Sequence, residues 1–329
     1  MLKEKIFSGC ITDIEGFRLG HASNLDAYTG VSVILCPEGT VGSCELRGTA
    51  TATRGIDALR AEHLVGNIDA LVFTGGSAYG LASSDGVMQF LEEQGRGFKA
   101  GVHTVPTVAS SVLFDLNFGD GKIRPSSKMG YDACVNSFSK EGSQGSVGAG
   151  TGATVAKLLG KSGAMKGGLG TASCSLPSGG KVGALAVVNA YGSIYEYTSN
   201  IKIASPLKDC KNKKFVDTEE YLRLHGRPTE GFGTTVENTT LVAVTTNVNL
   251  NKNETHKLSQ MAAHGLILSV RPSYTTVDGD VVFALSNGKF EESLDVVGES
   301  AKFVVGQAIC RAIKEADGFG IIPSWKDLN

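Results

Sequence analysis

Glu237-Asn238-Thr239-Thr240, followed by Leu241-Val242-Ala243-Val244, is the stretch of this chain that says most about its fold. An amide precedes two threonines, and the threonines open an apolar run that predicts a buried strand. Cleavage between Asn238 and Thr239 would leave Thr239 with a free α-amino group beside its hydroxyl. An α-amine titrates near pH ~7.7–8.0, so it can take the hydroxyl proton and activate a weak nucleophile. The layout favours a chain that cuts itself, although taken alone it also fits a turn asparagine and two ordinary strand residues, which is the commoner case.

The composition is that of a globular protein with a large core. The chain has 329 residues, 41% of them hydrophobic and 19% charged, a length that allows one large or two ordinary domains. Its formal net charge of −2 argues against a nucleic-acid partner. Glycine accounts for 43 residues, against a usual share of about 7%. Because these glycines lie among alanine, valine and leucine, they predict tight turns and close backbone contacts.

Cysteine and histidine usage bears on compartment and cofactors. The seven cysteines are an odd number without a CxxC pair, and the first residues lack the apolar core of a secretory signal. No apolar run approaches the ~18–20 residues of a membrane span. The six histidines are dispersed, without ligand spacing. We therefore expect a cytoplasmic protein with no membrane partner, no bound metal and no cofactor.

The hydrophobic pattern alternates between strands and helices. Strands are expected at 31–36, 68–74, 182–189, 241–246 and 281–285, and helices through Val87 to Leu91, at 154–159, at 253–270 and at 297–315. The last third thus predicts a βαβ-like unit. Residues 119–146 are polar and glycine-rich, which predicts a long loop. Residues 200–236 are charged and predict a surface linker, where a cleavage site would be reachable.

Two glycine-rich motifs lack the surrounding sequence that their usual functions need. Gly148-x-Gly150-x-x-Ala153 matches a relaxed dinucleotide fingerprint, but no apolar strand precedes it and no acid follows at ~20 residues. Gly75-Gly76-Ser77-Ala78-Tyr79 nearly makes a nucleophile elbow, with Tyr79 where glycine is needed. Both are interpreted as tight turns, and a dinucleotide oxidoreductase stays a distant alternative.

Asp278-Gly279-Asp280 stands directly before the predicted strand 281–285. Asp-Gly is a common turn signal. Alternatively, two carboxylates at the mouth of a buried strand can orient an ammonium and a hydroxyl together, and such a pair raises one of its own pKa values. Lys157, on an apolar helix-like stretch, would ordinarily be a lysine that snorkels to solvent. Asn189, at the end of a strand, would ordinarily be a turn amide.

These pieces occur together in one family. The chain resembles the DmpA-type aminopeptidases (L-aminopeptidase/D-esterase), which include the β-peptidyl aminopeptidases and the endo-type 6-aminohexanoate-oligomer (nylon oligomer) hydrolase. The similar segments are, in order, 74–81 (TGGSAYGL), 112–116 (VLFDL), 148–150 (GAG) with Lys157, 187–189 (VVN), 238–240 (NTT) and 278–280 (DGD) with 283–284 (FA). The Asn-Thr junction and the Asp-Gly-Asp sequence are closest to the nylon-oligomer branch, since the aminopeptidase branch has Gly-Ser at the junction.

The resemblance implies a mechanism and a fold. Thr239 would be a nucleophile released by self-cleavage after Asn238, so that a single domain of residues 1–329 becomes fragments 1–238 and 239–329. The fragments would stay together because the new N-terminus is an internal strand. The implied fold is α/β, a four-layer α-β-β-α sandwich of the N-terminal-nucleophile type. Roles around the nucleophile are implied for Lys157, Asn189, Asp278 and Asp280.

One departure from the family concerns Phe114, because the nylon-oligomer branch has tyrosine at this substrate-binding position. A phenol could donate a hydrogen bond to a substrate or an oxyanion, and Phe114 cannot. The family also tends to assemble as homo-oligomers of cleaved protomers.

Several functions fit the sequence. A hydrolase would act on small peptides, amino-acid amides or esters, or ω-amino acid oligomers, and which amide it cuts is open. An acyltransferase of the ornithine acetyltransferase style would use the same threonine and pass the acyl group to an amine. A third hypothesis is that the chain is an uncleaved, non-catalytic relative that binds a small molecule.

Overall fold

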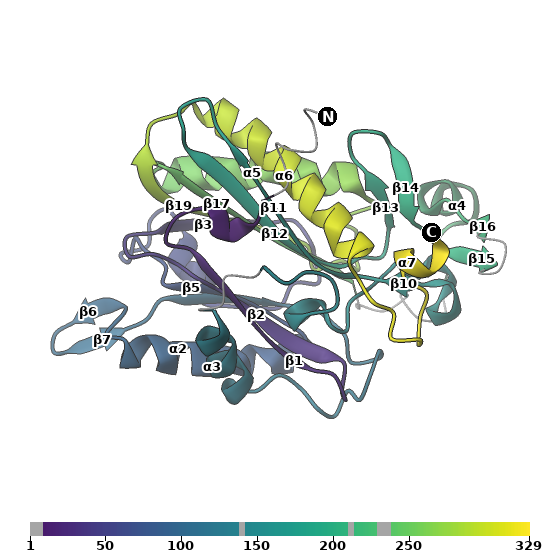
Figure 1. Ribbon diagram of the computed structural model, residues 1–329, viewed down its shortest axis with the longest axis horizontal. Coiled ribbons are helices and arrows are strands. Elements are labelled where there is room, and N and C mark those ends of the chain that lie inside the picture. Colours follow the sequence, from purple (N-terminus) through teal and green to yellow (C-terminus); the bar gives the residue numbers. More distant parts are fainter. Residues whose placement is uncertain (1–8, 138–141, 210–213, 229–237) are drawn as a thin grey trace.

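The computed structural model describes residues 9–137, 142–209, 214–228 and 238–329, and every structural statement below concerns these residues. Two five-stranded sheets lie face to face between helices (Figure 1). In spatial order, the first sheet consists of β1 (Arg18–Asn24), β2 (Thr29–Leu35), β5 (Ala70–Thr74), β8 (Val108–Val112) and β4 (Thr53–Arg54). The second consists of β11 (Gly168–Ser175), β12 (Lys181–Asn189), β17 (Thr239–Val248), β19 (Val281–Phe290) and β3 (Val41–Leu46).

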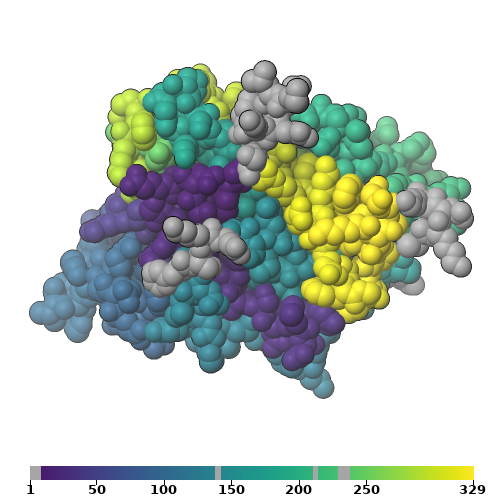
Figure 2. Space-filling view, viewed as in Figure 1, coloured from purple at the N-terminus to yellow at the C-terminus, as the bar shows by residue number. Residues whose placement is uncertain are grey.

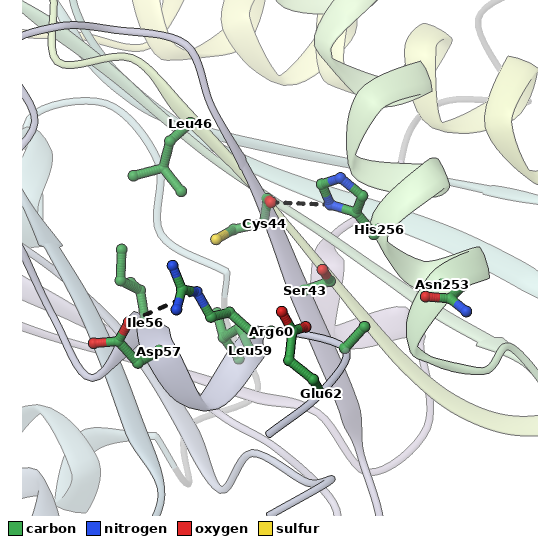
Figure 3. Close-up of a pocket in the computed structure, with 11 residues that line it drawn as sticks. Ser43, Cys44, Leu46, Ile56, Asp57, Leu59, Arg60, Glu62, Asn253 and His256 are labelled. Carbon is green, nitrogen blue, oxygen red and sulfur yellow. Dashed lines mark hydrogen bonds and ion pairs between the residues drawn. The ribbon is translucent and has the colours of Figure 1, made fainter. Parts of the chain in front are cut away.

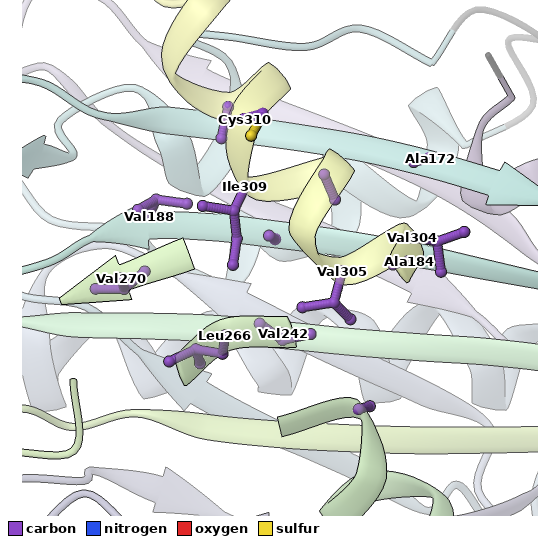
Figure 4. Close-up of a cluster of buried hydrophobic side chains, with 14 of the residues drawn as sticks. Ala172, Ala184, Val188, Val242, Leu266, Val270, Val304, Val305, Ile309 and Cys310 are labelled. Carbon is purple, nitrogen blue, oxygen red and sulfur yellow. The ribbon is translucent and has the colours of Figure 1, made fainter. Parts of the chain in front are cut away.

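Alternating side chains explain the four layers. Leu241 and Ala243 of β17 face the first sheet. Between the two sheets, the ring centroids of Phe73 on β5 and Phe283 on β19 lie 5.8 Å apart. The intervening Val242 and Val244 face the helices α5 (Lys252–Ser269) and α6 (Leu294–Lys314), as Figure 4 shows for Val242. Helices α2 (Ser83–Glu93) and α3 (Ser127–Asn136) cover the outer face of the first sheet. The expected four-layer α-β-β-α sandwich is confirmed.

Strand β17 is an internal strand. It pairs antiparallel with β12 and parallel with β19, and α5 forms the crossover between β17 and β19. The predicted βαβ unit is therefore present. Because β17 begins at Thr239 and is hydrogen-bonded on both sides, a break before Thr239 would leave the strand in place.

Two sequence predictions about local structure are wrong. The expected loop 119–146 contains α3, which Ser126 caps by accepting a hydrogen bond from the Met129 N–H at 3.5 Å. The expected helix 154–159 is a strand, β9 (Thr154–Val155), paired with β10 (Met165–Lys166), followed by a 3-10 turn. Ala156 adopts a φ of +59°, which ends any helix at this point.

The expected linker 200–236 is also partly structured. It holds β14 (Ile201–Ala204), β15 (Leu207–Asp209), β16 (Lys214–Phe215) and α4 (Thr218–His225), while 210–213 and 229–237 lie outside the described residues. Strand β14 joins β13 (Ser193–Glu196) and β18 (Val270–Arg271) in a small sheet.

The remaining elements are short. They are the hairpin β6 (Phe98–Ala100) and β7 (His103–Val105), helix α7 (Trp325–Leu328), and 3-10 turns at Ile11–Asp13, Ile56–Leu59, Ser77–Ala82, Gly148–Gly150, Lys157–Leu159 and Lys161–Gly163. The C-terminal segment lies on the surface beside the N-terminal strands (Figure 2), with the rings of Tyr28 and Phe319 5.0 Å apart. None of the helices described is long and apolar enough to cross a membrane.

Candidate active site

Strand pairing brings the predicted site residues to one end of the second sheet. Asn189, the last residue of β12, lies directly opposite Thr239, the first residue of β17. On the other side, Asn238 forms a parallel bridge with Asp278, just before β19. Residues from three distant parts of the sequence therefore meet because neighbouring strands start or stop at the same edge of the sheet.

The peptide bond between Asn238 and Thr239 is buried and its carbonyl has two hydrogen-bond donors. The Thr239 hydroxyl donates to the Asn238 carbonyl oxygen at 2.5 Å, and the Gly279 N–H donates to the same oxygen at 2.8 Å. Asn238 is 1% and Thr239 4% exposed, so water does not compete for these contacts. A fixed N–H aimed at a carbonyl oxygen stabilises negative charge that develops there when the carbonyl is attacked.

Gly279 was missed as a site residue by the sequence analysis, which treated it as part of a turn. A Cβ at this position would lie 2.8 Å from both the Thr239 Oγ1 and the Ala50 carbonyl oxygen, too close for any other residue without a shift. The available signal was a glycine between two aspartates, because glycine allows a close backbone approach.

The segment after β3 was missed entirely. The Gly48 N–H donates to the Asp280 carbonyl oxygen at 3.2 Å, and the Ala50 N–H donates to that of Asp278 at 3.1 Å. These contacts tie the Asp-Gly-Asp backbone to the edge of the second sheet. Because only backbone groups take part, no side-chain motif could have indicated them.

Both aspartates of the Asp-Gly-Asp segment are buried and accept hydrogen bonds from nearby N–H and O–H groups. The Asp280 carboxylate accepts the Thr240 N–H at 2.6 Å and the Tyr274 N–H at 2.8 Å. Asp278 accepts the N–H of Thr275 at 3.1 Å, together with the Thr275 hydroxyl. Burial, and next the charge of Asp278, raises the pKa of Asp280 to about 8. Burial also raises the pKa of Asp278, against the opposing charge of Lys157, so burial shifts both groups toward their neutral form.

Lys157 and Asn189 form the opposite side of the site. The Lys157 ammonium donates to the side-chain oxygen of Asn189 at 2.9 Å and to its backbone oxygen at 3.1 Å. Lys157 is 1% exposed, so the interpretation as a snorkelling lysine is wrong. The Thr154 N–H donates to the same amide oxygen at 3.0 Å, and the Asn189 amide N–H donates to the Phe114 carbonyl oxygen at 3.1 Å. Lys157, Thr154 and Phe114 therefore fix the orientation of this amide.

The predicted residues thus lie together, with Phe114 half-buried and joined to the group through its backbone carbonyl. Tyr191 is a further neighbour that the sequence analysis missed. Its N–H donates to the Asp278 carboxylate, and burial raises the pKa of its phenol to about 12. Its place two residues after Asn189 was the available signal. Within the described ranges, no group of three His, Cys, Asp or Glu side chains is arranged to hold a metal.

A cavity of about 380 Å³ lies elsewhere, where β3 faces the start of α5 (Figure 3). It is lined by Cys44, Arg60 and His256 among others, and the His256 ring is 3.1 Å from the Cys44 carbonyl oxygen. None of the predicted site residues lines it. The cavity is therefore not part of the candidate active site.

The fold has a known counterpart. The L-aminopeptidase D-Ala-esterase/amidase from Ochrobactrum anthropi, described as a variant of the Ntn (N-terminal nucleophile) hydrolase fold, superposes with a TM-score of 0.70. The superposition covers 94% of this chain and 86% of that one, at 17% sequence identity. This chain therefore has the fold of that Ntn hydrolase variant.

Sequence comparison gives the family. The family model described as peptidase family S58 matches residues 9–320. An uncharacterized aminopeptidase of Mycobacterium tuberculosis is 35% identical, over 97% of each chain. A 6-aminohexanoate-oligomer endohydrolase of a Kocuria species is 26% identical, over 92% of this chain and 85% of its own. The chain belongs to peptidase family S58 and is a hydrolase that acts on C–N bonds, as the resemblance in its motifs indicated.

Proposed function

We propose that this enzyme cuts its own chain between Asn238 and Thr239 and then uses Thr239 as an N-terminal nucleophile. Its substrates would be small peptides, amino-acid amides or esters, or ω-amino acid oligomers. The observation that carries the proposal is the meeting of the Thr239 hydroxyl and the Gly279 N–H at one buried carbonyl oxygen, 2.5 and 2.8 Å away.

In the self-cleavage step, the Thr239 Oγ attacks the Asn238 carbonyl carbon. The C–N bond breaks, the acyl group moves to the oxygen as an ester, and the proton from the hydroxyl goes to the departing nitrogen. The Gly279 N–H stabilises the oxyanion that forms in between. Water then opens the ester, which leaves a carboxylate on Asn238 and a free amine on Thr239.

In turnover, the Thr239 amine takes the proton from its own hydroxyl as the oxygen attacks the substrate carbonyl. The leaving amine receives that proton, and the acyl group stays on Thr239 as an ester until water hydrolyses it. Asp280 holds the Thr240 N–H and so places the nucleophile, with Asp278 beside it. Asn189, held by Lys157, stabilises the substrate oxyanion or keeps Thr239 in place.

The substrate class follows from the relatives and the charge of the site. One relative carries the name of an aminopeptidase and another that of a 6-aminohexanoate-oligomer hydrolase, and both kinds of substrate can present a free amino end. The buried aspartate pair can bind an ammonium. We also propose a homo-oligomer of cleaved protomers, because the family that the motifs resemble tends to assemble in this way. We place it in the cytoplasm because the six cysteines described have free thiols.

The test is denaturing intact mass spectrometry of freshly purified protein, with N-terminal sequencing of any small fragment. A fragment that begins Thr-Thr-Leu-Val-Ala and ends at Asn329 is the expected result. The purified protein is then offered L-alanine p-nitroanilide, β-alanine p-nitroanilide and 6-aminohexanoate oligomers. A chain that stays whole after prolonged incubation would overturn the proposal, and transfer of the acyl group to an added amine in preference to water would move it to the acyltransferase.

A further inference from the structure

A second pair of buried charged groups, Lys166 and Asp115, lies behind the candidate active site. Lys166, on β10, is 0% exposed and Asp115 is 5% exposed. Each charge favours the ionised form of the other. An ammonium that leaves water without full hydrogen bonding is very costly, and an apolar side chain of similar volume often packs as well or better. Packing alone therefore does not explain an ammonium at this position.

Lys166 holds one turn of the backbone. Its ammonium donates to the carbonyl oxygens of Gly150 at 3.0 Å, Ala153 at 2.8 Å and Gly167 at 2.7 Å. These three contacts match the three N–H donors of a lysine. Two of the carbonyls belong to the turn 150–153, which leads directly into Thr154.

Asp115 holds a second backbone segment. Its carboxylate accepts the Thr29 hydroxyl at 2.7 Å and the Gly76 N–H at 2.7 Å. These contacts anchor residues 114–115 to the end of the first sheet. A Cβ at Gly152 would lie 2.7 Å from the Asp115 Cβ, so the turn held by Lys166 and the segment held by Asp115 are in direct contact.

Both segments end on the same side chain. Thr154, after the turn, donates its N–H to the Asn189 amide oxygen at 3.0 Å, and Phe114, before Asp115, accepts the Asn189 amide N–H at 3.1 Å. We infer that Lys166 and Asp115 are positioning residues that orient the Asn189 amide from its two ends. The inference rests on the proposed function, because that function gives Asn189 its place in catalysis.

The ionisation of the pair agrees with this geometry. Burial lowers the pKa of Lys166 to about 7, against the opposing influence of Asp115 and Asp317. Burial raises the pKa of Asp115 to about 6, opposed chiefly by the bonds from Thr29 and Gly76. Burial thus brings the amine close to the balance between its charged and neutral forms near pH 7, a cost that core filling alone would not require.

The decisive experiment is chemical rescue of Lys166→Ala. The alanine lacks a propylammonium, so propylammonium chloride is the probe and 1-propanol is its neutral control. Two rates are measured beside the wild type: release of the 239–329 fragment after pulsed in vitro translation, and hydrolysis of L-alanine p-nitroanilide. We expect both to fall about 10–100-fold, as for a small misplacement of a catalytic group, with KM within about twofold. Propylammonium should restore at least a third of the lost rate and 1-propanol should not.

Two further variants keep the test decisive if the alanine variant folds poorly. Lys166→Met fills the space without an ammonium and should show the same loss of kcat with an unchanged melting temperature. Met165→Ala, in the same strand and 0% exposed, makes a cavity but keeps the ammonium, so propylammonium should not alter its rates.

The outcomes separate the two proposals. Wild-type rates in Lys166→Met would overturn the positioning role, and so would a slow Lys166→Ala whose rates propylammonium does not raise. The proposed function stands in both cases. A wild type that is not cut between residues 238 and 239 would overturn the proposed function, and the positioning role with it.

Discussion

The two sides of the candidate active site satisfy their charges differently. On the lysine side, Lys157 and Lys166 donate to carbonyl and amide oxygens of the surrounding backbone and of Asn189. On the acid side, Asp278 and Asp280 accept bonds from N–H and O–H groups, yet burial raises both pKa values. The charge of Lys157 opposes the shift at Asp278 without cancelling it, so the acid side is short of positive charge in the uncut chain.

Cleavage would change only the acid side. The new α-amine of Thr239 would lie next to the Thr240 N–H, which already contacts Asp280 at 2.6 Å, and it would be a cation whenever it holds a proton. A nearby cation favours the ionised form of a carboxylate, so we expect cleavage to lower the pKa of Asp280. Under the proposed function, the lysine side is a fixed scaffold, and the acid side gains its missing positive charge when the chain is cut.

The largest expected effect comes from Thr239→Ala, which removes the nucleophile of both proposed reactions. No fragment beginning at residue 239 should form, and hydrolysis of L-alanine p-nitroanilide should fall to background. Intact mass and a rate assay measure the two effects. Thr239→Ser is the matched control, because it keeps a hydroxyl and should still be cut. A cleaved Thr239→Ala chain, or an uncut one that hydrolyses amides, would contradict the assignment.

A smaller effect is expected from Gly279→Ala, which perturbs the acid side through the backbone. The added methyl group would meet the Thr239 Oγ1 and the Ala50 oxygen at 2.8 Å, so either the hydroxyl or the N–H donor must move. Self-cleavage should slow by about 10-fold or more, as measured by the time course of fragment release. Gly66→Ala is the control, since a Cβ there meets nothing within 4 Å. Equal rates in the two variants would show that Gly279 is only a turn residue.

The central part of the fold could be predicted from sequence because its patterns are local. The strands at 241–246 and 281–285 and the helix at 253–270 correspond to β17, β19 and α5 within a few residues. Strand β9 was mistaken for a helix because its pairing with β10 and the positive φ of Ala156 depend on tertiary contacts. Helix α3 was missed because its sequence is polar and contains Gly130.

The site residues also divide into those that a local sequence pattern marks and those that depend on tertiary contacts. Thr239, Asp278 and Asp280 are recognisable because each stands at the mouth of an apolar strand. The burial of Lys157 could not be read from its neighbours, because its partner Asn189 is far away in sequence. The Gly279 N–H and the Gly48 and Ala50 contacts are backbone groups, which every residue but proline carries and which no side-chain motif can mark.

The acid side should also affect stability in a pH-dependent way. The pKa of Asp280 is raised from its ordinary 3.8 to about 8 by burial and by Asp278. Between these values the folded chain binds a proton that the unfolded chain has lost, so stability falls as the pH rises from about 4 to about 8. In a Thr239→Ala background, which keeps the chain uncut, Asp280→Asn should flatten this fall. Melting temperatures from pH 5 to pH 8 test this, and parallel curves for the two proteins would contradict it.

The smallest expected effect comes from Phe114→Tyr, which restores the tyrosine of the nylon-oligomer branch. The Phe114 carbonyl accepts the Asn189 amide at 3.1 Å through the backbone, so the substitution leaves the lysine side unchanged. One added hydrogen bond is worth about 0.5–1.5 kcal/mol, so hydrolysis of 6-aminohexanoate oligomers should rise by no more than about 10-fold. Self-cleavage should keep its rate, because its oxyanion is served by Gly279.

The matched control for this prediction is Phe98→Tyr, which adds a phenol to the exposed hairpin strand β6, where Phe98 is 43% exposed. It should change neither rate. If Phe114→Tyr accelerates self-cleavage as strongly as oligomer hydrolysis, the two reactions share an oxyanion site, and the separation of a fixed lysine side from a changing acid side fails. If only oligomer hydrolysis rises, the side chain at position 114 lies closer to the substrate oxyanion than to the Asn238 carbonyl. Phe114 then limits which amides this enzyme cuts well.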